Sequence, residues 1–184
     1  MSVFIIFLRG VNVGGHKKIK MDELRALCAS LKLRNPQTYV QSGNVVFEAP
    51  DQDSLTLAAR IESAIEKKMG FQSDVLIRSA AELRSVVSSN PFEGRVGIEP
   101  AKLLVTFLGA DPDADARAKI GSLEVDVEEL RLAGRELYIY FPDGQGKSKL
   151  SLAPLDRGAA KLKWTGRNRN TVTNLLAMAE ELGG

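Results

Sequence analysis

The sequence predicts an α+β fold of two ferredoxin-like halves of the βαββ type, packed as one compact unit and completed by C-terminal helices. Two observations support this fold class. The order strand, helix, hairpin, helix occurs twice along the 184 residues, and the glycine of the first predicted hairpin, Gly43, has a counterpart in Gly134. A βαββ unit followed by a helix builds an antiparallel sheet covered by helices on one face. We therefore expect a first half over residues 1–92 and a second half, with the C-terminal helices, over residues 101–184.

The first half opens with an unbroken apolar run that is typical of a buried strand. Ser42-Gly43 then separates two short runs and predicts a hairpin, because glycine tolerates the positive φ of a tight turn. Gly70 follows an apolar stripe at helical spacing and predicts the end of a helix. Ser79 and Glu82 have the spacing of a capping box, which predicts the start of the next helix. The expected elements are strands at residues 3–8, 38–41, 44–49 and 71–79, and helices at residues 21–32, 54–69 and 79–89.

The second half repeats this order after a stretch that contains glycine and proline. An apolar run predicts a strand, an acidic-headed segment predicts a short helix, and two runs around Ala133-Gly134 predict another hairpin. Apolar residues at helical spacing predict two further helices, the last of which begins near Thr171. The expected elements are strands at residues 103–108, 125–132 and 136–141, and helices at residues 111–121, 153–161 and from 171 onward.

Composition excludes several classes of protein. Lys and Arg number 25 against 23 Asp and Glu, a formal net charge of +2, so the chain has neither a histone-like tail nor an acidic activation segment. No apolar run approaches the roughly 18–20 residues of a membrane span, and we expect no membrane partner. The opening MSVFIIFLRGV lacks the basic region of a signal peptide, and the single Cys28 cannot form an intramolecular disulfide. A cytoplasmic setting is therefore expected.

Charge is segregated along the chain. From Gly144 to Asn174 there are seven basic residues and only Asp156 as an acid, and residues 9–20 hold four basic residues and no acid. Residues 111–129 hold seven acids and two basic residues. If the two basic segments meet in the fold, they form a positive patch that favours an anionic partner.

Three loops carry small, polar or basic residues that packing does not require, at residues 9–18, 141–149 and 165–171. The first has the glycine spacing of a phosphate-binding P-loop but lacks its Lys and Ser or Thr, so it is not a Walker A loop. The second ends in Gly146-Lys147-Ser148 and would make an anion nest. The third precedes the last helix, where Asn170 or Thr171 is expected as the N-cap and the helix N-terminus favours a negative ligand.

These loops define a hypothetical ligand-binding surface with two kinds of side chain. Basic side chains would neutralise the ligand's charge, and amides would orient it through hydrogen bonds. The first group is Arg9, Lys149 and Arg167, and the second is Asn12, Gln41, Asn44 and Asn168. We expect all seven to converge on one surface that binds a phosphate-bearing small molecule, such as a nucleotide, or a nucleic acid.

Five motifs along the chain are LRGVNVGG from Leu8, YVQSGNVVF from Tyr39, NPF from Asn90, PDG from Pro142 and NTV from Asn170. With these motifs the chain resembles an uncharacterised, mainly bacterial family, domain of unknown function 1697 (DUF1697), over nearly its whole length. The resemblance implies an α+β fold with ferredoxin-like halves and no established activity, cofactor or catalytic residue. One departure is Arg169, where the family pattern commonly has a tryptophan.

Two other functions stay open. One is a small hydrolase or transferase that acts on a phosphorylated substrate, with His16 or Ser148 as the reactive residue. The other is a structural or interaction protein whose polar loops only hold the fold together. Cys28 shares a helical face with leucines and fits a buried hydrophobe better than a nucleophile. The sequence predicts no metal site and does not identify the cofactor, the reaction or the oligomeric state.

Overall fold

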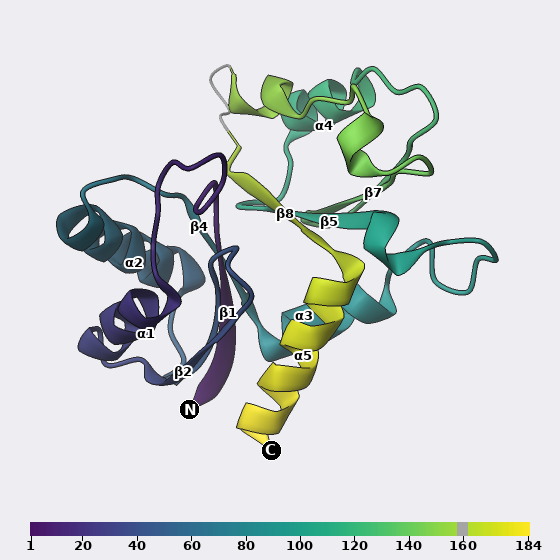
Figure 1. The fold of residues 1–184 in the computed structure, drawn as a ribbon. Helices are drawn as coiled ribbons and strands as arrows, with labels where there is room; N and C mark the ends of the chain where they lie inside the picture. The colour runs from purple at the N-terminus through teal and green to yellow at the C-terminus, as the bar shows by residue number, and fades with distance from the viewer. Residues whose placement is uncertain (158–161) are drawn as a thin grey trace. The chain divides into compact units, whose positions relative to one another are not determined.

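The structure is a computed structural model that describes residues 1–157 and 162–184 (Figure 1). The chain divides into two compact units. The N-terminal unit comprises Met1–Ser85 with Thr173–Gly184, and the central unit comprises Val86–Val172. Each unit contains a four-stranded antiparallel sheet. The predicted α+β class with two βαββ-like halves and a C-terminal helix is therefore confirmed, whereas the domain limits at residues 92 and 101 remain a prediction.

The sheet of the N-terminal unit has the strand order β2-β3-β1-β4. Its inner strand β1 is buried on both faces, since Ile5, Ile6 and Phe7 are fully inaccessible to solvent. The helices α1 and α2 lie on the same face of this sheet and share one hydrophobic core with it (Figure 1). The bounds are β1 Ser2–Leu8, α1 Met21–Ser30, β2 Arg34–Tyr39, β3 Asn44–Ala49, α2 Ser54–Met69 and β4 Val75–Ser79.

Local side-chain chemistry sets the helix ends in this unit. The Asp53 carboxylate accepts a hydrogen bond from the Thr56 amide at 2.8 Å and caps α2, which Gly70 ends at a φ of +77°. The predicted capping box is present: the Glu82 amide donates to the Ser79 hydroxyl at 3.1 Å, and the Ser79 amide donates to the Glu82 carboxylate at 2.8 Å. It opens α3, Ala80–Ser88.

The sheet of the central unit has the corresponding order β6-β7-β5-β8. Apolar side chains from this sheet, from α4 and from the segments after β7 form its core. Part of the helix expected at residues 153–161 is a short 3-10 turn, Ala153–Asp156, and residues 158–161 lie outside the described part of the chain. The bounds are β5 Leu103–Leu108, α4 Ala114–Gly121, β6 Glu129–Ala133, β7 Glu136–Tyr140 and β8 Trp164–Asn168.

Part of the third loop expected from the sequence is a strand, β8. Most of the segment expected as a loop at residues 165–171 pairs with β5, so that Arg167 lies opposite Val105. The last helix, α5, spans Arg169–Gly183, and Asn168 caps it by accepting a hydrogen bond from the Thr171 amide at 2.9 Å. The N-cap is thus Asn168, not Asn170 or Thr171. None of the helices in the described ranges is long and apolar enough to cross a membrane.

Candidate functional site

The first loop and the hairpin tip form one joined surface in the N-terminal unit. The Leu8 amide donates a hydrogen bond to the Gly43 carbonyl at 2.9 Å, and the Asn12 side-chain amide donates to the Gln41 carbonyl at 2.7 Å. Gly43 has a φ of +79°, and a Cβ atom there would lie 2.6 Å from Cγ2 of Val11. Only glycine allows the hairpin tip to approach the loop this closely.

Asn12 closes the first loop on itself. Its Nδ2 donates to the Ile19 carbonyl at 3.0 Å, and its Oδ1 accepts from the Ile19 amide at 2.9 Å. Together with the bond to Gln41, these contacts use both ends of the side-chain amide. Asn12 therefore holds the loop in place, and its backbone φ of +55° is one that Asn tolerates better than most residues.

A cavity of about 410 Å³ lies beside these contacts, and we call it the lysine pocket. Within the described chain, the ammonium groups of Lys18 and Lys20 make no ion pair or hydrogen bond, and Glu23 is the one acid that lines the pocket. Both lysines are exposed. The pocket therefore offers a ligand two ammonium groups without an ion-pair partner among the described residues, and with Glu23 its formal charge is +1. Its lining residues are Asn12, Gly15, Lys18, Ile19, Lys20, Glu23 and Gln41.

Arg9 lies in a different pocket of the same unit, about 570 Å³ in volume. Its guanidinium is 3.7 Å from the Asp74 carboxylate, and Lys17 donates to the Gln72 carbonyl at 2.7 Å. The acids Glu62 and Glu66 also line this pocket. The basic groups here are bound to the protein itself, so this pocket is less suited to an anion than the lysine pocket.

Asn44 has no access to solvent. Its side-chain amide donates to the Tyr39 carbonyl at 3.0 Å and to the Ser42 hydroxyl at 2.8 Å. These two bonds span the hairpin turn from inside. Asn44 therefore supports the segment that presents Gln41, and its side chain is not at the surface where a ligand would bind.

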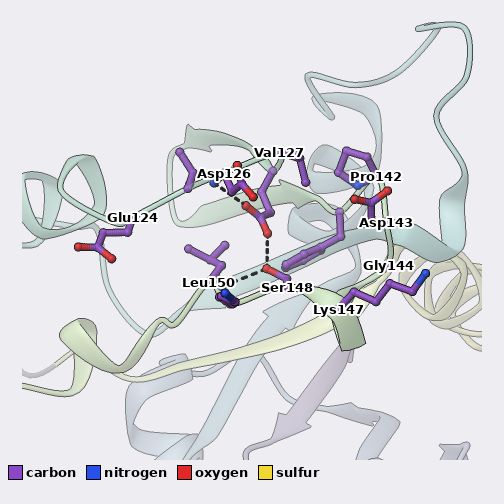
Figure 2. Close-up of a pocket in the computed structure, with 13 residues that line it drawn as sticks. Glu124, Asp126, Val127, Pro142, Asp143, Gly144, Lys147, Ser148 and Leu150 are labelled. Atoms are coloured by element: carbon purple, nitrogen blue, oxygen red, sulfur yellow. Dashed lines mark hydrogen bonds between the residues drawn. The ribbon is translucent and has the colours of Figure 1, made fainter.

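The second loop lines a cavity of about 300 Å³ in the central unit, which we call the carboxylate pocket (Figure 2). In Figure 2, Asp126 and Val127 lie on one side of the pocket and Ser148 and Leu150 on the other. Four carboxylates face two ammonium groups here, so the balance of charge is negative and disfavours phosphate. The charged lining residues are Glu124, Asp126, Glu128, Asp143, Lys147 and Lys149.

Ser148 is held by two hydrogen bonds in this pocket. Its hydroxyl donates to the Glu128 carboxylate and accepts from the Leu150 amide at 3.0 Å. The bond from Ser148 is the main reason that the pKa of Glu128 lies below its ordinary value, followed by the bond from the Asp126 amide. A carboxylate with a lowered pKa is a poor general base, so the pair does not activate Ser148 as a nucleophile.

Arg167 and Asn168 are neighbours on β8 with different surroundings. Arg167 is buried, and its guanidinium donates to the Thr165 hydroxyl at 2.9 Å and to the Gly166 carbonyl at 2.8 Å. Burial lowers the pKa of Arg167 to about 10, which still leaves it charged at neutral pH. Asn168 is exposed, and its side-chain oxygen is engaged as the cap of α5.

Cys28 and His16 are two further side chains with reactive groups. Burial raises the pKa of the Cys28 thiol to about 12, so it stays protonated and inert. His16 is an exposed loop residue whose backbone pairs with Val13. In the described ranges no group of three or more His, Cys, Asp or Glu side chains could hold a metal ion.

The seven predicted site residues thus fall into several environments. Asn12 and Gln41 meet at the lysine pocket, with Asn44 behind them, and Arg9 lines the neighbouring pocket. Lys149, Arg167 and Asn168 belong to the central unit, and the convergence of all seven stays a prediction. Lys18 and Lys20 were missing from the predicted site. The excess of basic residues over positions 9–20 was the signal that pointed to them.

Comparisons with known proteins agree with the motifs at the first loop and hairpin. The model of a family described as "Protein of unknown function (DUF1697)" matches residues 1–138. The conserved bacterial protein SP0830 from Streptococcus pneumoniae has a similar fold, with a TM-score of 0.75 and 23% sequence identity. The alignment covers 97% of this chain and 98% of that one. No curated protein matches the chain. Since the family model covers most of the sequence, including the loop and hairpin that line the lysine pocket, the chain belongs to the DUF1697 family.

Proposed function

We propose that this protein binds a phosphate-bearing ligand, a nucleotide or a nucleic acid, at the lysine pocket. One observation carries the proposal: two lysine ammonium groups without a partner among the described residues, those of Lys18 and Lys20, stand beside a cavity of about 410 Å³. Cavities of roughly 300–1,000 Å³ accommodate small-molecule ligands. Two unpaired positive charges at the rim of such a cavity favour an anion.

The charges of the other pockets support this choice of site. In the Arg9 pocket both basic side chains are bound by protein oxygens, from Asp74 and Gln72. In the carboxylate pocket the acids outnumber the lysines. A phosphate would therefore be repelled or would have to break existing contacts at these two places, but not at the lysine pocket.

The predicted roles of the other site residues are part of the same proposal. Gln41 is exposed at the pocket and its side-chain amide would orient the ligand. Charge neutralisation by Arg9, Lys149 and Arg167 is an alternative form of the proposal, which the salt dependence of binding distinguishes from binding by the two lysines alone. We also propose a cytoplasmic location.

A second candidate function is a structural or interaction role. It is favoured by the internal use of three predicted ligand contacts, since Asn12, Asn44 and Asn168 all form side-chain hydrogen bonds with the protein's own backbone. On this view the polar loops stabilise the fold and no small ligand binds.

Titration calorimetry with inorganic pyrophosphate, and with a single-stranded deoxythymidine oligonucleotide, tests the first proposal. The double variant Lys18→Gln/Lys20→Gln should lose affinity about tenfold or more, because hydrogen bonds to charged groups contribute roughly 1.5–3 kcal/mol each. The matched control Lys67→Gln/Lys68→Gln removes two charges from the last turn of α2 and should bind as the wild type does. Failure of both probes to bind the wild-type protein would exclude the proposal and favour the structural role.

A further inference from the structure

Glu23 is the one carboxylate among the residues that line the lysine pocket. Its side chain is exposed, and it makes no hydrogen bond or ion pair within residues 1–157 and 162–184. Lys20 lies three residues before it at the start of α1, a spacing at which helical side chains can pair, yet no ion pair joins the two. The pocket therefore holds an unpaired carboxylate as well as two unpaired ammonium groups.

Glu23 also has a role in the helix that needs no ligand. It lies in the first turn of α1 together with Asp22, and carboxylates in the first turn interact favourably with the N-terminal end of a helix. Asp22 forms an ion pair with Arg25 and is not among the residues that line the lysine pocket. A role in the helix alone would therefore make the two acids equivalent, whereas a role in binding would distinguish Glu23 from Asp22.

The chemistry of a carboxylate limits what can fill this pocket. An ionised carboxylate accepts hydrogen bonds and donates none. A ligand that displaces water from Glu23 leaves the carboxylate without hydrogen bonds unless the ligand itself supplies a donor. A ligand made of phosphate alone would in addition be repelled by the negative charge. The ligand that matches all three charged groups therefore carries an anionic group for Lys18 and Lys20 and a hydrogen-bond donor for Glu23.

From these groups we infer that the lysine pocket takes a phosphate compound that also carries an amino group, and that Glu23 is the residue that selects it. The inference rests on the proposed function and names the ligand class for the same site. Among nucleotides it means those with cytosine, adenine or guanine, which have an exocyclic amine, and not those with uracil or thymine. Uracil presents a carbonyl oxygen where cytosine presents its amine, and that amine is a common partner of Glu and Asp side chains in nucleic-acid complexes.

Titration calorimetry with CMP and UMP tests this selectivity, because the two nucleotides share the ribose and the phosphate. The wild-type protein should bind CMP about tenfold more tightly than UMP. Glu23→Gln should reduce the ratio to about twofold or less, because the Gln amide also donates to the uracil carbonyl. The same chemistry occurs in a strand, so deoxycytidine and deoxythymidine oligonucleotides form the second arm. A preference seen only with the oligonucleotides would support the inference and assign the ligand to nucleic acid.

Inorganic pyrophosphate should respond to the same variant in the opposite direction. Glu23→Gln raises the formal charge of the pocket from +1 to +2, so pyrophosphate should bind about threefold more tightly. CMP should bind about fivefold more weakly, because its amine loses a hydrogen bond to a charged acceptor. A variant that merely damaged the fold would weaken both. The matched control Asp22→Asn removes the same charge from the same helical turn and should leave the ratio of CMP to UMP affinity unchanged.

Three outcomes would overturn the inference: equal wild-type affinities within both pairs of probes, a preference for cytosine that Glu23→Gln does not change, or a preference that Asp22→Asn removes equally. The proposed function survives each of them as long as Lys18→Gln/Lys20→Gln weakens the binding of pyrophosphate. It fails separately if no phosphate probe binds the wild-type protein, or if that double variant binds pyrophosphate as the wild type does.

Discussion

Gly43 connects backbone conformation with the geometry of the candidate site. Its φ of +79° favours glycine, and its close approach to Leu8 and Val11 leaves no room for a side chain. This contact seats the hairpin tip on the base of the first loop. The neighbouring hydrogen bond from Asn12 to the Gln41 carbonyl requires the hairpin tip to stay in this position against the first loop. A change at one glycine should therefore affect both stability and the lysine pocket.

Gly43→Ala should destabilise the protein by about 2–5 kcal/mol, because the left-handed conformation costs roughly 1–2 kcal/mol and overpacking costs roughly 1–3 kcal/mol. The control is Gly70→Ala, at a nearly equal φ of +77° but with no atom within 4 Å of the added Cβ. Gly70→Ala should lose only the free energy of unfolding that the left-handed conformation costs. Urea unfolding of both variants measures the difference, and equal losses would mean that the Val11 contact contributes nothing.

Strand β8 marks the limit of what local sequence signals predict. Thr165 and Arg167, which are polar, alternate along it with Trp164, Gly166 and Asn168. Gly and Asn are common in loops, so the segment has no apolar periodicity. What makes it a strand is its pairing with β5, a long-range interaction that a scan along the chain does not detect. The charge of Arg167 suggested an exposed residue, whereas the sheet buries it.

Elements whose signals are local were predicted well. The capping box of Ser79 and Glu82 and the stop at Gly70 depend on residues within one helical turn, and both are present in the structure. At the candidate site, the hairpin around Gly43 was predicted for the same reason. Contacts between distant residues were not predicted. An example is the bond from Asn12 to the carbonyl of Gln41, which lies far along the chain, whereas its other carbonyl partner, Ile19, is in the same loop.

A hydrogen bond from the Ser148 hydroxyl to the Glu128 carboxylate joins the second loop to the segment before β6. Ser148→Ala should raise the pKa of Glu128 toward its ordinary value, because the largest cause of the lowering is lost. In the wild type, the lowered pKa of Glu128 stabilises the folded state at pH values above the unfolded-state pKa near 4.5. This stabilisation is lost as the pH falls through the lower pKa of the folded state.

A carboxyl-detected NMR titration of both proteins measures this effect directly. Asp53 serves as the internal reference, because the Thr56 amide and hydroxyl lower its pKa in the other unit and should do so in both proteins. An unchanged Glu128 titration in Ser148→Ala would mean that the hydrogen bond does not hold the loop in solution.

At the scale of the whole molecule, the formal net charge of +2 is the sum of basic and acidic regions that nearly cancel. The basic first loop belongs to the N-terminal unit, and the acidic residues 111–129 belong to the central unit. The second loop was expected to bind anions, yet its lysines share a pocket with four carboxylates. Charge counted along the sequence therefore overstates the part of the surface that is available to phosphate.

The salt dependence of oligonucleotide binding measures how many charges take part. For single strands, the logarithm of the binding constant falls with the logarithm of salt concentration by about 0.7 per phosphate that is neutralised. Lys18 and Lys20 acting alone predict a slope of about −1.4, and the additional engagement of Arg9, Lys149 and Arg167 predicts about −3.5. We expect the shallower slope, because Arg167 is buried and Arg9 and Lys149 lie beside carboxylates. A slope near −3.5 that Lys149→Gln reduces would instead show that the basic segments of both units act together on one ligand.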